Sequence, residues 1–222
     1  MAERMKFAAS YSGGKDGALA LYRAIQSGHE PVCLLTTYNE DAGRSWFHGV
    51  PTELLCKISE LTGIPLELVK TGKGDDYGRD FETALARLRE QYGAQACVFG
   101  DIDLQLHYDW DIARCKAAGV AGMFPLWNGG RRELVHELID TGFKAVITIV
   151  NTSFLSEKYL GKTLTRELAE EIAAEGADIC GENGEYHSFV YDGPLFREPV
   201  NYKLHEIVRQ GPYAILPISL AF

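Results

Sequence analysis

Ser12-Gly13-Gly14-Lys15-Asp16-Gly17 decides the fold, because it lies between an apolar run at Phe7-Ala8-Ala9 and a helix-like run at Ala18-Leu19-Ala20-Leu21. A strand, a turn and a helix in this order direct unpaired backbone N–H groups and a helix N-terminus at one point. The same turn carries one cation, Lys15, and one carboxylate, Asp16. The stretch therefore predicts a site for the phosphates of a nucleotide.

Short apolar segments alternate with amphipathic segments through the first two thirds of the chain. The expected strands are 5–11, 32–37, 66–70, 96–100, 122–124 and 145–150, and the expected helices are 16–27, 52–62, 80–92, 109–118 and 132–141. This alternation favours right-handed crossovers and a parallel sheet with helices on both faces. We therefore expect an α/β fold with a Rossmann-like parallel sheet, whose ligands bind beyond the carboxyl ends of the strands.

The pattern changes after residue 125. One helix and strand continue the alternation, and a polar loop (151–162), a helix (165–175) and hairpins through 185–190 and 201–208 are expected to follow. We therefore expect a nucleotide-binding domain over residues 1–125. A smaller α+β domain over residues 126–222 is expected to carry the substrate-specific features, because nothing in it repeats the turn at residues 12–17.

The composition excludes several classes of protein. The net charge of −9 over 222 residues disfavours non-specific binding to nucleic acid or to an anionic membrane. No apolar run approaches the roughly 20 residues that span a bilayer. The five cysteines occur singly, which fits neither a disulfide framework nor a structural zinc site. We expect a cytoplasmic protein without nucleic-acid or membrane partners, and a homodimer stays open.

The turn at residues 12–17 differs from two familiar phosphate loops. A P-loop needs a hydroxyl residue directly after its lysine, where this chain has Asp16, and the dinucleotide fingerprint G-x-G-x-x-G is absent from the turn. The order of strand, S-G-G-K-D and helix resembles the pyrophosphate loop of the N-type ATP pyrophosphatases. Those enzymes cleave ATP between its α and β phosphates.

The residue types suit that chemistry. Backbone N–H groups and a helix dipole stabilise the charge that grows on departing pyrophosphate, and Lys15 would meet the same charge. Gly13 and Gly14 let the backbone approach the phosphates closely. Asp16 would hold Mg2+, which prefers oxygen ligands. The simpler alternative is a Gly-Gly turn followed by an Asp-capped helix.

A second polar cluster lies near the predicted strand at 185–190. It combines two carboxylates three residues apart with an amide, an imidazole and a hydroxyl around two glycines, in the stretch Gly181-Glu182-Asn183-Gly184-Glu185-Tyr186-His187-Ser188. By composition alone this is a polar turn that enters a hairpin.

Together these motifs resemble the diphthine-ammonia ligase family. The matching pieces are Tyr11 to Asp16, Gly100-Asp101-Ile102, Phe124 to Trp127, Leu160-Gly161-Lys162, Gly181 to Ser188 and Asp192 to Phe196. They span nearly the whole chain in the family's order. The resemblance implies an adenine nucleotide alpha hydrolase-like fold that uses ATP and Mg2+.

The resemblance also implies a reaction and its residues. In the family, ATP adenylylates a carboxylate of diphthine, a modified histidine on translation elongation factor 2, and ammonia displaces AMP to give an amide. The residues implied for ATP are Tyr11, Ser12, Gly13, Gly14, Lys15, Asp16, Gly17, Gly100 and Asp101. The residues implied for the acceptor are His48, Glu182, Asn183, Gly184, Glu185, His187 and Ser188.

Glu185 joins Lys15 and Asp16 as an expected catalytic residue. Its carboxylate would orient the acceptor or take a proton from ammonium. The alternative is a structural role, in which the carboxylate accepts hydrogen bonds from backbone N–H groups of the glycine-rich turn.

The chain departs from the family pattern at both motifs. Gly17 replaces a usual serine, which removes a donor worth about 0.5–1.5 kcal/mol. In the family's G-E-G-G-E-[FY]-E-T pattern, Asn183, His187 and Ser188 replace Gly, Glu and Thr. This form resembles the bacterial branch, for some of whose members a role in corrinoid salvage has been proposed. The acceptor therefore stays open between diphthine and a corrinoid carboxylate.

Other functions stay open beside the ligase. Sulfur transfer to tRNA is disfavoured by the missing C-x-x-C pair and the acidic charge. A non-catalytic nucleotide sensor is compatible with Gly17. Asp109 and Asp111 are interpreted as an acidic helix N-terminus that complements the helix dipole.

Overall fold

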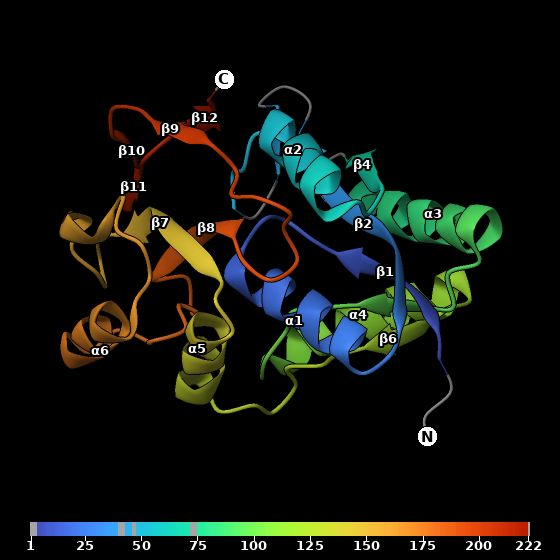
Figure 1. The fold of residues 1–222 in the computed structure, drawn as a ribbon. Coiled ribbons are helices and arrows are strands. Elements are labelled where there is room, and N and C mark those ends of the chain that lie inside the picture. The colour runs from blue at the N-terminus through green and yellow to red at the C-terminus, as the bar shows by residue number, and fades with distance from the viewer. Residues whose placement is uncertain (1–3, 40–42, 46–47, 72–74, 222) are drawn as a thin grey trace.

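The parallel sheet lies in the N-terminal half of the chain (Figure 1). The computed structural model describes residues 4–39, 43–45, 48–71 and 75–221. The strands of this sheet are β1 (Lys6–Ser10), β2 (Glu30–Asn39), β3 (Arg44–Ser45), β4 (Leu66–Lys70), β5 (Ala96–Val98) and β6 (Ala121–Met123). Strand β1 pairs in parallel with β2 on one side and with β5 on the other. Strands β4 and β6 extend the parallel sheet, and β3 adds a short antiparallel edge.

Helices cover both faces of this sheet, as the alternation of segments predicted. They are α1 (Lys15–Gln26), α2 (Thr52–Thr62), α3 (Asp75–Tyr92) and α4 (Gln105–Ala118). Helices α1 and α2 pack in one apolar cluster with Phe7 and Ala9 of β1. Helices α3 and α4 pack in the other cluster with Ala8, whose side chain points to the opposite face of the strand. Alternate residues of β1 thus reach two buried layers.

The C-terminal half contains a separate antiparallel sheet with the order β10-β11-β7-β8. Its elements are α5 (Arg131–Asp140), β7 (Lys144–Asn151), a 3-10 turn (Glu157–Tyr159), α6 (Arg166–Ala174), β8 (Tyr186–Asp192), β9 (Tyr202–Leu204), β10 (Val208–Gln210), β11 (Tyr213–Ile215) and β12 (Ile218–Leu220). Strands β9 and β12 form a third, two-stranded sheet. The fold is therefore mixed α/β with a mainly parallel central sheet.

Two details of the expected arrangement were wrong. The strand expected at 145–150 does not continue the parallel alternation, because β7 pairs antiparallel with β8 and β11. An apolar run buried on both faces has the same pattern in either kind of sheet. The C-terminal hairpin is formed by β10 and β11, whereas β8 returns to β7 and β9 pairs with β12.

The two halves share buried contacts. One apolar cluster contains residues of α1, α2, β7 and β8. Arg23 of α1 pairs with Glu137 of α5, and the Val190 backbone N–H donates to the Gly13 carbonyl over 2.8 Å. The last bond holds β8 against the turn at residues 12–17. The division at residue 125 stays a prediction.

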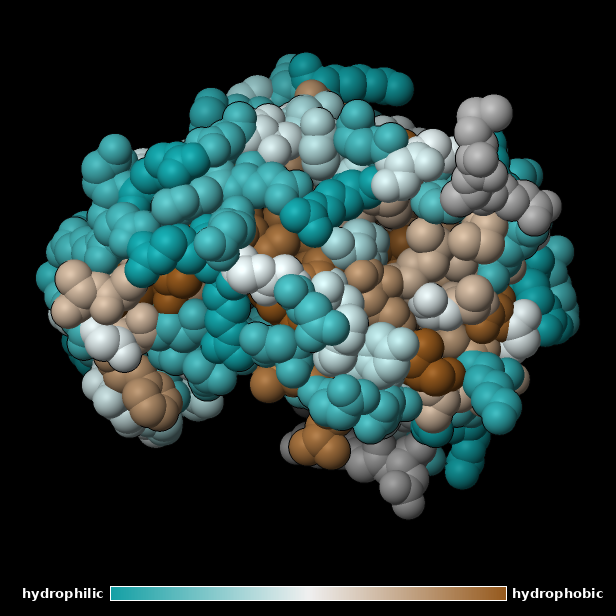
Figure 2. Space-filling view, turned by 90° about the horizontal axis from the view of Figure 1, so that it is seen from below, coloured by the Kyte–Doolittle hydropathy of each residue, from teal (hydrophilic) through white to brown (hydrophobic). Residues whose placement is uncertain are grey.

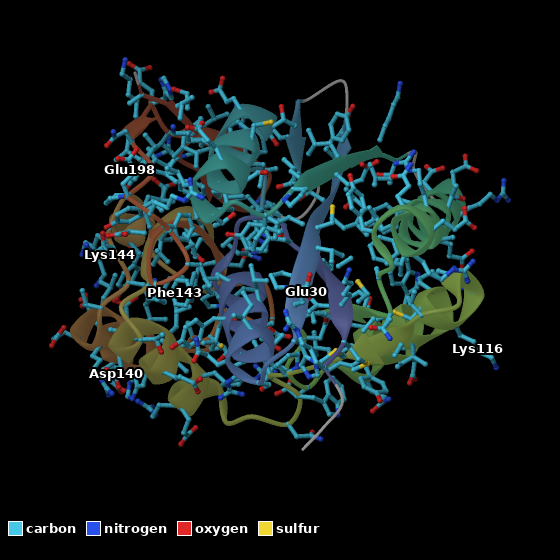
Figure 3. The ribbon with its side chains drawn as sticks, turned by 45° about the vertical axis from the view of Figure 1, so that its right-hand side comes forward. Glu30, Lys116, Asp140, Phe143, Lys144 and Glu198 are labelled. Carbon is cyan, nitrogen blue, oxygen red and sulfur yellow. The ribbon has the colours of Figure 1, made fainter. Side chains whose placement is uncertain are left out.

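The surface is that of a charged protein. The face in Figure 2 is mainly hydrophilic on its left-hand and upper parts, and hydrophobic residues gather from its centre to its right-hand side. Side chains project from both ends of the molecule in Figure 3, where Lys116 of α4 lies far from Asp140 and Lys144 of the C-terminal half. Within the residues that the structure describes, no helix is both long and apolar enough to span a membrane.

Candidate functional site

A cavity of about 490 Å³ opens at the carboxyl ends of β1 and β5. Ser10 and Ser12 line it from the end of β1, and Gly100 and Asp101 line it from the end of β5. Neighbouring parallel strands whose connections leave in opposite directions create a crevice at this place, where such sheets bind ligands. The sheet order therefore accounts for the position of the cavity.

The turn at residues 12–17, called the phosphate loop below, forms one wall of the cavity. Gly13 has a φ of +87°, which favours glycine, and α1 begins two residues later at Lys15. Gly14 precedes the helix, and no described side chain caps it there. The first backbone N–H groups of α1 are therefore left to bind an anion.

Lys15 is held at this wall by a carboxylate and an aromatic ring. Its Nζ lies 2.6 Å from Asp16 Oδ2 and 5.5 Å from the centre of the Tyr186 ring. The side chain is only 5% exposed. Burial disfavours the ammonium, but Asp16, Cys180 and Tyr186 together outweigh it and raise the pKa of Lys15 well above its usual value. The cavity therefore keeps a fixed positive charge beside the phosphate loop.

The stretch from Gly181 to Ser188 forms the facing wall. Gly181 has a φ of +69°, and a Cβ there would come within 2.9 Å of Tyr186. The Tyr186 hydroxyl donates to the Ile179 carbonyl over 2.7 Å. Cys180 Sγ lies 4.0 Å from Asp16 Oδ1, which brings the two motifs together across 164 residues of sequence.

Glu182 is the carboxylate of this stretch that faces the cavity. Burial, followed by the nearby charge of Asp16, raises the pKa of Glu182 to about 7. Its proton is therefore exchangeable near neutral pH, which makes it suited to accept or donate a proton.

Glu185 occupies a different place. Its carboxylate accepts hydrogen bonds from the backbone N–H groups of Asp178 (3.3 Å) and Asn183 (3.1 Å), and from Asn183 Nδ2 (3.3 Å). The side chain is 5% exposed and does not line the cavity. This geometry matches the turn-holding alternative, in which Glu185 shapes the loop that carries Glu182.

Two histidines lie between the walls. His48 Nδ1 lies 2.7 Å from Ser12 Oγ, and the His48 and His187 rings meet edge to face at 5.0 Å between centres. A Cβ at Gly14 would fall 2.4 Å from His48 Nε2, so glycine is required beneath this ring. Burial lowers the pKa of both histidines, and Lys15 lowers it further. Both imidazoles are therefore neutral at physiological pH.

The sequence did not reveal the apolar wall of the cavity. It consists of four aromatic residues from three elements, Tyr77 and Phe81 of α3, Trp110 of α4 and Phe99 after β5. The Trp110 ring centre lies 5.7 Å from those of both Tyr77 and Phe81. The spacing of Tyr77 and Phe81, four apart on one helix face, was the available signal. Such a wall suits the flat face of a nucleobase.

The interpretation of Asp109 and Asp111 as a helix N-terminus was wrong. Helix α4 begins at Gln105 and its first turn carries no acidic residue. Asp111 is 6% exposed and lines the cavity, where burial and then Asp101 raise its pKa to about 9. Asp101 Oδ1 also lies 3.2 Å from His107 Nδ1. At neutral pH, Asp111 therefore carries a proton beside the Asp101 carboxylate.

The structure brings most of the expected site residues to one cavity. Those that line it are Ser12, Lys15, Asp16, Gly17, His48, Gly100, Asp101, Glu182, Gly184, His187 and Ser188. Those outside its lining are Tyr11, Gly13, Gly14, Asn183 and Glu185. Tyr11 is buried, and its backbone N–H donates to the Leu35 carbonyl over 2.9 Å. Its role in the structure is to fix the end of β1.

Two models of known protein families match this chain. Residues 5–122 match the family described as "Diphthamide synthase N-terminal domain", and residues 131–219 match "Diphthamide synthase C-terminal domain". The chain belongs to the diphthamide synthase family. Both walls of the cavity fall within the matched segments, the phosphate loop in the first and residues 181–188 in the second.

Named relatives of this family member are diphthine–ammonia ligases. The proteins of Mus musculus and Homo sapiens are 27% and 25% identical to it, over 97% of this chain and 89% of theirs. The Schizosaccharomyces pombe protein is 24% identical over 93% of this chain and 38% of its own longer chain. These relatives are eukaryotic, and membership of the bacterial branch stays a prediction.

The chain also has some similarity to a solved structure. It is titled "The crystal structure of predicted subunit of tRNA methyltransferase from Methanocaldococcus jannaschii DSM" and has 18% identity and a TM-score of 0.44, over 88% of this chain and all of that one. A score at this level carries no argument about function.

Proposed function

We propose that this chain is an ATP-dependent amide ligase that activates an acceptor carboxylate as its adenylate and transfers ammonia to it. One observation supports this most strongly. A single cavity is lined by part of the phosphate loop with its buried lysine, by an aromatic wall, and by most of the residues 181–188, which the family resemblance assigns to the acceptor. The relatives named diphthine–ammonia ligase support the same reaction class.

The proposed reaction has two steps. An oxygen of the acceptor carboxylate attacks the α-phosphorus of ATP, and the bond to the bridging oxygen breaks, which releases pyrophosphate. The nitrogen of ammonia then attacks the acyl carbon, and the carbon–oxygen bond to AMP breaks. The products are the amide, AMP and one proton. The site must therefore stabilise a departing anion first and accept a proton second.

The phosphate loop serves the first step. Lys15 and the open N–H groups of α1 would meet the negative charge that grows on pyrophosphate. Donors that are already fixed in place need no reorganisation as the bond breaks. The aromatic wall of Tyr77, Phe81 and Trp110 would hold the base at the other end of the cavity.

Mg2+ fits the donor set of this cavity. Asp16, Asp101 and Glu182 offer carboxylate oxygens, yet no cluster of three metal-binding side chains exists in the part of the chain that the structure describes. Mg2+ is usually bound by one or two carboxylates together with substrate phosphates. Asp16 would hold the ion, whose charge would offset that of the phosphates.

Glu182 and the two histidines serve the second step. The neutral imidazoles of His48 and His187, and Glu182 with a pKa near 7, can accept the proton lost from nitrogen. Ser188 lines the same region. Glu185 acts as a positioning residue that holds the loop of Glu182.

The acceptor that the family name indicates is diphthine, borne on a protein. A corrinoid carboxylate is the alternative acceptor that the sequence leaves open.

Identification of the nucleotide products tests this function. The protein would be incubated with ATP, Mg2+, ammonium and diphthine-bearing elongation factor 2, and nucleotides would be separated by chromatography. We expect AMP and pyrophosphate that depend on both the acceptor and ammonium. ADP would contradict the proposal, and the absence of turnover with every acceptor would favour the non-catalytic sensor.

A further inference from the structure

A second cavity, of about 540 Å³, adjoins the first. It lies between the β2–β3 edge of the parallel sheet and the antiparallel sheet, so both halves of the chain build it. Arg44 and His48 line it on one side, and Ile149 of β7 and Ile215 of β11 line it on the other. His48 lines both cavities. The two cavities therefore meet at the ring that rests on the phosphate loop.

Arg44 gives the second cavity its charge. It is the only charged residue among the described residues that line this cavity. Most arginines of the chain form ion pairs, but Arg44 forms none within the described ranges. Among the described residues, Arg44 and Arg197 are the two arginines without an ion pair, and of these only Arg44 lines a cavity. Its fork of donors matches a carboxylate.

The rest of the lining combines apolar residues with polar ones, among them Asn39, Ser45 and Gln210. Pro217 and Ile218 continue the surface formed by Ile149 and Ile215, and Thr148 adds a hydroxyl. A cavity of this size, with an apolar group of side chains, several hydrogen-bonding groups and one cation, fits a short aliphatic chain that ends in an anion.

Exposed apolar residues lie on the strands and the connection that lead to this cavity. Leu204, Ile207, Val208 and Tyr213 are each 39–47% exposed. Val208 lines the cavity and pairs with Ile215, and Leu204 pairs with the cavity residue Ile218. Such a rim provides contact area for a macromolecule around the cavity.

We propose that this second cavity receives the carboxylate-bearing side chain of a protein acceptor, with Arg44 as its counter-ion. The inference rests on the ligase function proposed above, which requires a carboxylate beside the ATP cavity. The carboxylate approaches the phosphate loop past His48, because that residue is common to both cavities. The apolar rim contacts the protein that carries the side chain.

Binding can be tested without any turnover. The full chain, labelled with nitrogen-15, would be titrated with butanoate and separately with uncharged butanamide while backbone amide signals are followed by NMR. We expect butanoate, but not butanamide, to shift the signals of Thr148, Ile149 and Ile215. Arg44→Gln should remove these shifts. Arg197→Gln is the matched control, because Arg197 also lacks an ion pair among the described residues and lies outside both cavities.

Two results would overturn the inference. One is the absence of butanoate-dependent shifts at these positions in the unmodified protein. The other is an Arg44→Gln variant that shows the same shifts as the unmodified protein.

Turnover gives a second readout. With diphthine-bearing elongation factor 2, Arg44→Gln should raise the acceptor KM roughly ten- to a hundredfold and leave the KM for ATP unchanged. Arg44→Lys should restore part of the loss, because it keeps the charge without the planar fork. An unchanged acceptor KM in Arg44→Gln would contradict the inference. If the unmodified protein forms no AMP, the ligase proposal fails, and the butanoate titration still decides the role of the cavity.

Discussion

Lys15 is the side chain on which the proposed pyrophosphate release depends. Its buried ammonium lies beside Asp16 at the start of α1. We predict that Lys15→Ala lowers the rate of AMP formation by about a hundred- to a thousandfold, the usual loss when one donor to a transition-state anion is removed. The rate of AMP release measures this effect, and circular dichroism shows whether the fold is intact.

Lys116→Ala is the matched control for Lys15→Ala. Lys116 points outward from the end of α4 (Figure 3) and is exposed. The Lys116→Ala variant should keep full activity. Wild-type activity in a folded Lys15→Ala protein would refute the role of the phosphate loop.

Asp111 makes stability depend on pH. Its pKa of about 9 in the folded protein exceeds the usual value of 3.8, so the folded state binds the extra proton between these values. The free energy of unfolding therefore falls as pH rises through this range. Asp111→Asn, which cannot ionise, should show a weaker decline of Tm between pH 6 and 9.

The magnitude of that effect can be read from thermal melts. Each kcal/mol of difference moves Tm by about 2–4 °C in a chain of this size. Asp109→Asn is the control, since Asp109 lies on the same helix outside the cavity lining. Parallel Tm curves for wild type and Asp111→Asn would show that Asp111 does not carry the proton.

At the level of elements, the first turn of α1 meets the end of β5 at Gly100. A Cβ at Gly100 would lie 2.8 Å from the carbonyl carbon of Asp16 and from the nitrogen of Gly17. We predict that Gly100→Ala destabilises the fold by about 1–3 kcal/mol, as overpacking does. It should also weaken ATP binding, because it moves the phosphate loop. Urea unfolding and calorimetric titration measure the two effects.

Gly17→Ala is the matched change on the other side of this contact. A Cβ there would meet Ser10 and Tyr11 at ordinary distances of 3.6 Å. It should stabilise α1 by up to about 1 kcal/mol, since glycine is a poor helix former. If both variants lose stability equally, the close approach at Gly100 is not the cause.

Elements with local boundary signals were predictable from sequence. Helix α2 has the expected bounds, Thr52–Thr62, because its apolar stripe is regular and Gly63 follows it in the left-handed conformation with a φ of +71°. Helix α3 begins five residues before the expected position. Its first turn is charged and contains Gly78, so apolar periodicity does not mark it. The partner of β7 was not predictable, because a run buried on both faces does not reveal strand direction.

Some parts of the candidate site could likewise be predicted from the sequence, and others could not. The phosphate loop and residues 181–188 are contiguous, so their composition identifies them in the sequence. Asp111 and the aromatic wall reach the cavity only through the packing of α3 on α4. The Glu185 carboxylate accepts hydrogen bonds from the backbone of its own turn instead of lining the cavity, and this direction depends on the path of the backbone from Asp178 to Asn183. Sequence reasoning could name this residue but could not choose between its two roles.

At the scale of the whole molecule, the shared core joins the two halves. Apolar residues of α1, α2, β7 and β8 form one cluster, and β8 bonds directly to the phosphate loop. We predict a single cooperative unfolding transition in urea, with coincident curves from far-UV circular dichroism and tryptophan fluorescence. A fragment of residues 1–125 should not fold alone. Two separated transitions, or a folded fragment, would show that the halves are independent.

Oxygen-18 transfer tests the proposed adenylate most directly. The acceptor carboxylate would be labelled with oxygen-18, and the AMP formed with ATP, Mg2+ and ammonium would be analysed by mass spectrometry. We predict one oxygen-18 atom in each AMP, because a carboxylate oxygen bonds to the α-phosphorus and stays there when ammonia attacks the carbon. Label in inorganic phosphate or pyrophosphate, or unlabelled AMP beside amide product, would contradict the account.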